Sequence, residues 1–101
     1  RLGCTRIAAT GRLVDIAQLR GKTKAIEIYE LLNPLAAERR ELLLSYAAEL
    51  SSAIRDIKEG EYDRARATLK TCYERCKDDG AVIYHLRVLN KIALLKNKRD
   101  I

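Results

Sequence analysis

The sequence contains no Phe, Trp or Met, and tyrosine is its only aromatic residue. Proline occurs once and glycine five times in 101 residues, so few residues break regular structure. Charged residues make up 34% and hydrophobic residues 48%, a balance typical of one small ordered helical domain and not of a disordered tail. A core of Leu, Ile, Val and Ala favours close helix packing over a deep ligand pocket.

The chain lacks any run of about 20 apolar residues, so we expect no membrane insertion by this segment. It also lacks the charged, apolar and cleavage regions of a secretory signal. Because it begins at Arg1 without an initiating Met, we interpret it as a piece of a longer protein. The expected location is cytoplasmic, with any membrane anchor of the parent lying upstream.

Metal ligands and catalytic side chains are scarce. Cys4, Cys72 and Cys76 form no Cys-x-x-Cys pair, and His85 is the single histidine, so no recognised four-ligand zinc motif can be assembled. We interpret the cysteines as buried small apolar residues in a reducing compartment, and His85 as a packed or surface side chain.

The net charge is +6, with basic residues concentrated before residue 33 and after residue 86. A nucleic-acid site would gather them on one face beside aromatics or within a known motif, and neither is evident. Solvated faces and cations near helix C-termini explain most of this charge. A small basic nucleic-acid binder therefore remains only as a third alternative.

Residues 12–32 predict a β-hairpin. Val14 and Ile16 alternate with Asp15 in one β-prone run, and Ile26 and Ile28 alternate with Glu27 in the next, with a polar link containing Gly between them. A lone hairpin is marginal in water. It is expected either to be covered by the helices or to belong to a larger sheet.

Three helices follow in the pattern. Asn33 as N-cap and Pro34 at the first position predict one long helix over 35–59, ended by Gly60. A second is expected over 62–77, an Asp-Asp-Gly turn follows, and a third is expected over 81–96.

The last predicted helix has more apolar surface than one stripe requires. Two sets of aliphatic side chains fall on different faces: Val82, Ile83, Leu86, Leu89 and Ala93, and then Val88, Ile92 and Leu95. A helix that is apolar on two faces needs a second partner. We expect a homodimer or docking of a protein or peptide.

Gly60, Tyr62 and Ala65, followed by Leu69 and Cys72, resemble the second half of a tetratricopeptide repeat. In that family the Gly turns the chain and the small Ala lets two helices approach closely. The preceding helix fits in one of two registers. With Gly60 in register, Ser52 and Asp56 occupy apolar positions; with a loop one residue shorter, Leu50, Ala53, Ile54 and Ile57 do.

The first 33 residues resemble the end of the catalytic domain of class III adenylate or guanylate cyclases. The residues that match that closing hairpin are Arg12, Asp15, Gly21, Lys22, Tyr29, Glu30, Leu31 and Leu32. The resemblance implies a parent that makes cyclic AMP or cyclic GMP with Mg or Mn ions, and that works as a dimer. The family's catalytic and metal-binding residues all precede this hairpin, so this fragment is expected to be no enzyme and to hold no cofactor.

Two other interpretations use the same residues. Gly11-x-x-Val14-Asp15-x-Ala17 superficially matches the cyclase segment that carries an Asn/Arg pair, but Asp15 and Leu19 would replace that pair. Gly21-Lys22-Thr23 resembles the end of a P-loop, whose earlier glycine is Ile16 here. The hairpin interpretation is preferred to both.

Together these patterns predict a mainly α protein: a short N-terminal β-hairpin, a tetratricopeptide-like helical hairpin and one further helix. Residues 1–33 are assigned to the end of a cyclase domain and 34–101 to a helical regulatory or dimerisation module. The alternative is a tetratricopeptide-type adaptor unrelated to a cyclase. The residues predicted to serve packing or interaction are Gly60, Tyr62, Ala65, Leu69, Val88, Leu89 and Ile92.

Overall fold

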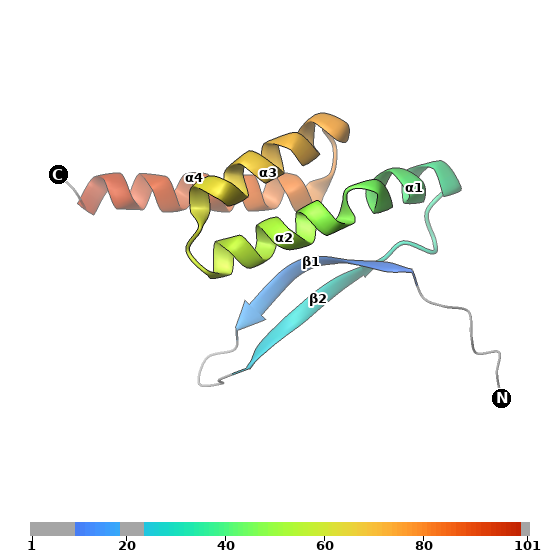
Figure 1. Ribbon diagram of the computed structural model, residues 1–101, viewed down its shortest axis with the longest axis horizontal. Helices are drawn as coiled ribbons and strands as arrows, with labels where there is room; N and C mark the ends of the chain where they lie inside the picture. The colour runs from blue at the N-terminus through green and yellow to red at the C-terminus, as the bar shows by residue number, and fades with distance from the viewer. Residues whose placement is uncertain (1–9, 19–23, 100–101) are drawn as a thin grey trace.

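The computed structural model describes residues 10–18 and 24–99. In these ranges two strands, β1 (Gly11–Gln18) and β2 (Ala25–Leu31), precede α1 (Ala37–Ser45), α2 (Ala47–Lys58), α3 (Tyr62–Arg75) and α4 (Gly80–Arg99). Figure 1 shows the hairpin on one side of α2, with α3 and α4 on the other. The predicted fold class, a β-hairpin followed by a helical hairpin and a further helix, is confirmed.

The strands pair antiparallel, with one irregularity at Val14 between the Leu13–Tyr29 and Asp15–Ile28 pairs. Side chains three residues apart on a regular strand point to opposite faces. The extra residue restores Ile16 to the face of Leu13, and both are buried. The buried pair is therefore Leu13 and Ile16, whereas Val14 is only partly buried. The link with Gly21 and Lys22 lies outside the described residues.

The helices cover the hairpin through β1. This strand packs against α2, whereas the apolar side chains of β2 are largely exposed to solvent. Those exposed side chains are Ile26, Ile28, Tyr29 and Leu31. The first expected arrangement, a hairpin covered by the helices, therefore holds for β1. The apolar side chains of β2 are not covered by any of the described residues.

The single helix predicted over 35–59 is wrong. The chain leaves helical geometry at Tyr46 (φ −126°, ψ 18°), which separates α1 from α2. Arg75 compensates for the break: its Nη2 donates to Ser45 Oγ at 2.8 Å, and its guanidinium lies over the Tyr46 ring at 5.7 Å. No Gly or Pro marks this position in the sequence. The contacts with Arg75 of α3 stabilise the break instead.

The predicted N-cap is also wrong. The first helix begins at Ala37, and Asn33 instead accepts a hydrogen bond from the Thr10 backbone N–H at 2.6 Å. The Asn33 side chain thus ties the end of the hairpin to its start. Pro34 lies in the turn that follows, three residues before the helix.

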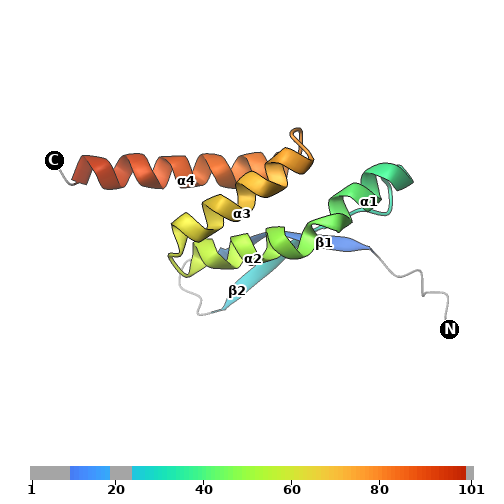
Figure 2. The ribbon, with the colours of Figure 1, turned by 45° about the horizontal axis from the view of Figure 1, so that its top comes forward.

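The remaining boundaries follow the predictions closely. Gly60, with φ +82°, turns the chain between α2 and α3. Asp79 caps α4, because its Oδ1 accepts from the Ala81 N–H at 3.1 Å. In Figure 2, α4 runs on past the loop that joins α2 and α3, so its C-terminal end projects from the helical layer.

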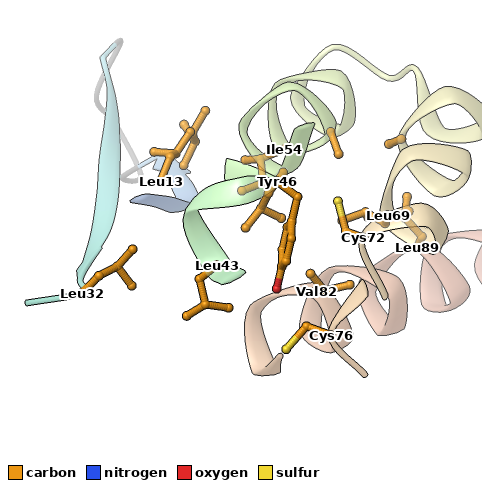
Figure 3. Close-up of a cluster of buried hydrophobic side chains, with 14 residues drawn as sticks. Leu13, Leu32, Leu43, Tyr46, Ile54, Leu69, Cys72, Cys76, Val82 and Leu89 are labelled. Carbon is orange, nitrogen blue, oxygen red and sulfur yellow. The ribbon is translucent and has the colours of Figure 1, made fainter. Parts of the chain in front are cut away.

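One core joins the hairpin to the helices. Figure 3 shows Leu13 between the hairpin and α2, and Leu69, Cys72 and Leu89 where the helices meet. All four are buried, as are Leu50, Ala53, Ile54 and Ala65 along the α2–α3 contact. None of the helices in the described ranges combines the length and apolar composition of a membrane span.

The Gly60 turn yields a prediction with a matched control. A Cβ at Gly60 would meet no atom within 4 Å, so Gly60→Ala strains only the backbone at positive φ. We expect it to lower the free energy of unfolding by about 1–2 kcal/mol in urea melts followed by circular dichroism. Gly80→Ala, equally free of contacts but without positive φ, should be neutral or stabilising. Equal losses in both variants would contradict the assignment of the Gly60 turn.

Candidate functional site

The best-defined polar site is a buried ion pair that joins the hairpin to the start of α4. Arg12 on β1 donates two hydrogen bonds to Asp79, from Nη1 to Oδ2 at 2.6 Å and from Nη2 to Oδ1 at 2.8 Å. The two side chains are 3% and 1% exposed. This two-pronged geometry is the strongest form of an Arg–carboxylate contact.

Other donors complete the site. Tyr46 donates its hydroxyl proton to Asp79 Oδ2 at 2.5 Å, and Arg12 Nε donates to Glu30 Oε1 on β2 at 2.9 Å. Figure 3 shows the Tyr46 hydroxyl directed toward the turn between α3 and α4. We call Arg12, Tyr46 and Asp79 the buried triad. The triad connects β1, the α1–α2 break and the α3–α4 turn.

Charge states follow from these contacts. Burial alone would raise the pKa of Asp79, but the hydrogen bonds from Arg12 and Tyr46 outweigh it and hold that pKa below its ordinary value. Burial likewise opposes the charge of Arg12, yet Asp79 and Glu30 raise its pKa. Burial and the Asp79 carboxylate both raise the pKa of Tyr46. At neutral pH the triad holds a carboxylate, a guanidinium and a neutral phenol.

Sequence reasoning did not identify the triad as a site. In the sequence, Arg12 stands out only within the hairpin resemblance, and Asp79 only as part of the Asp-Asp-Gly turn. They are 67 residues apart in the chain. Tyr46 carries a single weak local signal. Its only marker is that it is a tyrosine on an otherwise aliphatic stripe, where a buried hydroxyl needs a partner.

The predicted helical hairpin is formed. Ala65 and Leu69 are fully buried, and Tyr62 is half-buried at the start of α3. On α2 the buried apolar residues are those of the register with the shorter loop, Leu50, Ala53 and Ile54, with Ile57 partly buried against the core; Asp56 of the other register is also buried. Ser52 is exposed, and Asp56 accepts two hydrogen bonds from Arg64 at 3.2 Å.

The predicted interaction residues of the last helix do not share one surface. Leu89 is 1% exposed in the core, where it contacts neighbouring helices rather than solvent. Val88 lines a small pocket of about 60 Å³ beside His85. Ile92 lines an open groove of about 410 Å³ with Tyr62, Leu95 and Lys96. Leu94 and Leu95 are the exposed leucines of this helix, at 63% and 62%.

The cysteines and the histidine are packed, as predicted, where the structure describes them. Cys72 and Cys76 are buried free thiols, and Cys4 lies outside the described residues. Burial raises the pKa of Cys72. His85 is buried with Nε2 2.7 Å from the Val14 carbonyl, an acceptor, so Nε2 carries the proton. Within residues 10–18 and 24–99, no three His, Cys, Asp or Glu side chains gather as a metal site would require.

Comparisons with known proteins give no family. No protein-family model matches the chain, and neither curated proteins nor solved structures include a significant match to it. Function is therefore argued from the contacts themselves.

The buried triad predicts a large stability effect. Asp79→Asn removes the buried counter-charge of Arg12 and leaves it only the half-exposed carboxylate of Glu30, so we expect a loss of about 3–5 kcal/mol in the free energy of unfolding. Tyr46→Phe removes one hydrogen bond to a carboxylate and should cost about 1.5–3 kcal/mol. Arg64→Gln breaks a pair whose arginine is 63% exposed and should cost much less. Urea titrations measure all three, and equal losses for Asp79→Asn and Arg64→Gln would contradict a buried pair.

The lowered pKa of Asp79 sets a pH dependence. A carboxyl whose folded pKa lies below its unfolded value, ordinarily 3.8, contributes stability above that value and loses it as pH falls through the folded pKa. As pH falls below about 4, the wild-type free energy of unfolding should therefore drop more steeply than that of Asp79→Asn. Urea melts at stepped pH test this. Parallel curves for the two proteins would show that Asp79 is not the titrating group.

Proposed function

We propose that the chain is a non-catalytic C-terminal regulatory or oligomerisation module of a class III nucleotidyl cyclase that makes cyclic AMP or cyclic GMP. The single observation that carries this proposal is the buried pair of Arg12 and Asp79. Arg12 belongs to the hairpin that resembles the cyclase ending, and Asp79 belongs to the helical unit. The pair therefore fixes the hairpin rigidly to the helical unit.

The hairpin supports the proposal in two ways. Arg12 and Glu30, both residues of the cyclase resemblance, are cross-strand partners, with Arg12 Nη2 2.7 Å from Glu30 Oε1. Ile26, Ile28 and Leu31 on β2 are exposed although they are apolar. Such a surface is suited to packing against a larger catalytic domain.

Coupling would pass through the triad. The long helix expected to connect hairpin and helical unit is interrupted at Tyr46, so it cannot act as a straight rod. The interruption instead places the Tyr46 hydroxyl on Asp79. A shift of α3 or α4 would then move β1 through Arg12. Movement of β1 would in turn reach the catalytic domain to which the hairpin belongs. In the parent, the metals would be Mg or Mn, bound upstream of this chain.

A tetratricopeptide-type adaptor unrelated to a cyclase is the second candidate. The observation in its favour is the open apolar groove between α3 and α4, lined by Tyr62, Ile92 and Leu95. In this case the groove would receive a peptide or partner protein. The hairpin would be only a cover for α2. Both candidates are non-catalytic in this segment and cytoplasmic, and they differ in what precedes Arg1.

The test begins with the coding sequence upstream of Arg1. The cyclase proposal requires two spaced aspartates on strands and an Asn-x-x-x-Arg helix there, and their absence would leave the adaptor. The protein extended to include that region should convert ATP or GTP to a cyclic nucleotide with Mg²⁺ or Mn²⁺. Residues 1–101 alone should not.

The coupling role has its own measurement in the same extended protein. Asp79→Asn should change the cyclisation rate by roughly 2- to 30-fold, the range expected for 0.5–2 kcal/mol of coupling. Arg64→Gln, a change in the same helical unit but outside the triad, should leave the rate within error. A wild-type rate in Asp79→Asn, in a protein shown to be folded by circular dichroism, would remove the triad from the mechanism.

A further inference from the structure

The projecting end of α4 combines exposed leucines with positive charge. Leu94 and Leu95 are more than 60% exposed, and Lys91 and Lys96 flank them. From Gly80 to Arg99 the helix contains no acidic residue. Lys91, Ile92, Leu94, Leu95 and Lys96 are called the α4 end below. An apolar patch with a charged rim is typical of a protein interface.

The opposite charge lies beside Tyr62, a residue that lines the neighbouring groove. Tyr62 lines that groove together with Ile92 and Leu95, which places the start of α3 beside the α4 end. Glu59, Glu61 and Asp63 precede or flank Tyr62, and all three are exposed. Glu59 and Glu61 are close enough to Arg64 to help raise its pKa, after the larger effect of Asp56. These three residues are called the acidic loop.

We infer that the α4 end is an interface with a second copy of this chain, in which the α4 end of each copy lies on the acidic loop of the other. The inference deepens the assembly role proposed above and rests on it. Direct pairing of two α4 helices would bring together two surfaces that carry only positive charge. When each α4 end instead lies on the acidic loop of the other copy, opposite charges meet in two equivalent contacts, as a two-fold symmetric interface requires.

Other occupants fit the surface less well. An anionic membrane would attract the α4 end but repel the adjacent acidic loop. An acidic peptide bound in the groove would come near the acidic loop that flanks Tyr62 and meet the same repulsion. The interacting groups are free to pair between copies, because no ion pair among the described residues involves Glu61, Asp63, Lys91 or Lys96.

A charge-swap experiment on residues 1–101 tests the inference. Sedimentation velocity over a concentration series should show a wild-type dimer. Glu61→Lys with Asp63→Lys should raise the dissociation constant at least about tenfold, and so should Lys91→Glu with Lys96→Glu. An equimolar mixture of the two double variants should form a heterodimer of near wild-type affinity. The quadruple variant should dimerise by itself, because both of its contacts are again attractive.

Matched controls separate the interface from net charge. Lys70→Glu with Lys77→Glu changes the net charge as the α4 variant does, and Glu38→Lys with Glu41→Lys changes it as the loop variant does. All four control positions are exposed and lie outside the α4 end and the acidic loop. Both controls should dimerise as wild type does. Thermal melts should show every variant folded.

Several outcomes would overturn the inference. These are a wild-type monomer at the highest soluble concentration, a mixture of double variants that stays monomeric, or equal weakening by the controls. Binding of a monomeric wild type to vesicles containing phosphatidylserine would assign the α4 end to a membrane surface instead. If the charge-swap experiment fails while the extended protein still synthesises a cyclic nucleotide, only the proposed interface is refuted. A charge-swapped dimer without a cyclase upstream would sink only the cyclase assignment.

Discussion

A guanidinium and a carboxylate buried together constrain the whole of this small protein. Removing both charges from water costs several kcal/mol per ion, and the cost is recovered only when the geometry is good and every remaining polar atom has a partner. Arg12 and Asp79 satisfy that condition with two short hydrogen bonds, and Tyr46, Glu30 and the Ala81 N–H supply the remaining partners. The strand, the helix break and the α3–α4 turn must all be in place at once for the pair to be stable.

That requirement explains two features that otherwise look like irregularities. At the break between α1 and α2, Tyr46 is not helical. In this position its hydroxyl donates to Asp79 and its ring lies under the Arg75 guanidinium. The extra residue at Val14 disturbs the hairpin register, and it returns Ile16 to the buried face. Both departures from regular geometry serve the contact between hairpin and helices.

Much of the local structure was readable from residue patterns. Gly60, Asp79 and the spacing of Leu50, Ile54, Ala65 and Leu69 located the helical hairpin and its turns, because caps, positive φ and helical periodicity act over only a few residues. The buried triad and the exposed surface of the last helix were not readable in the same way. Leu89 and Val88 looked alike as apolar residues of one helix, and only packing shows that Leu89 is core while the projecting surface belongs to Leu94 and Leu95.

By itself, the sequence determined that a hairpin precedes helices, where the α2–α3 and α3–α4 turns lie, and that the core is built mainly from aliphatic side chains. These properties depend on neighbours in the chain. Tertiary structure decided that the first helix breaks at Tyr46, that Asn33 binds Thr10 rather than capping a helix, and that Arg12 meets Asp79. Each of those outcomes depends on a partner more than 20 residues away. Local propensities carry no information about such a partner, because the energy that selects it exists only after the layers have packed.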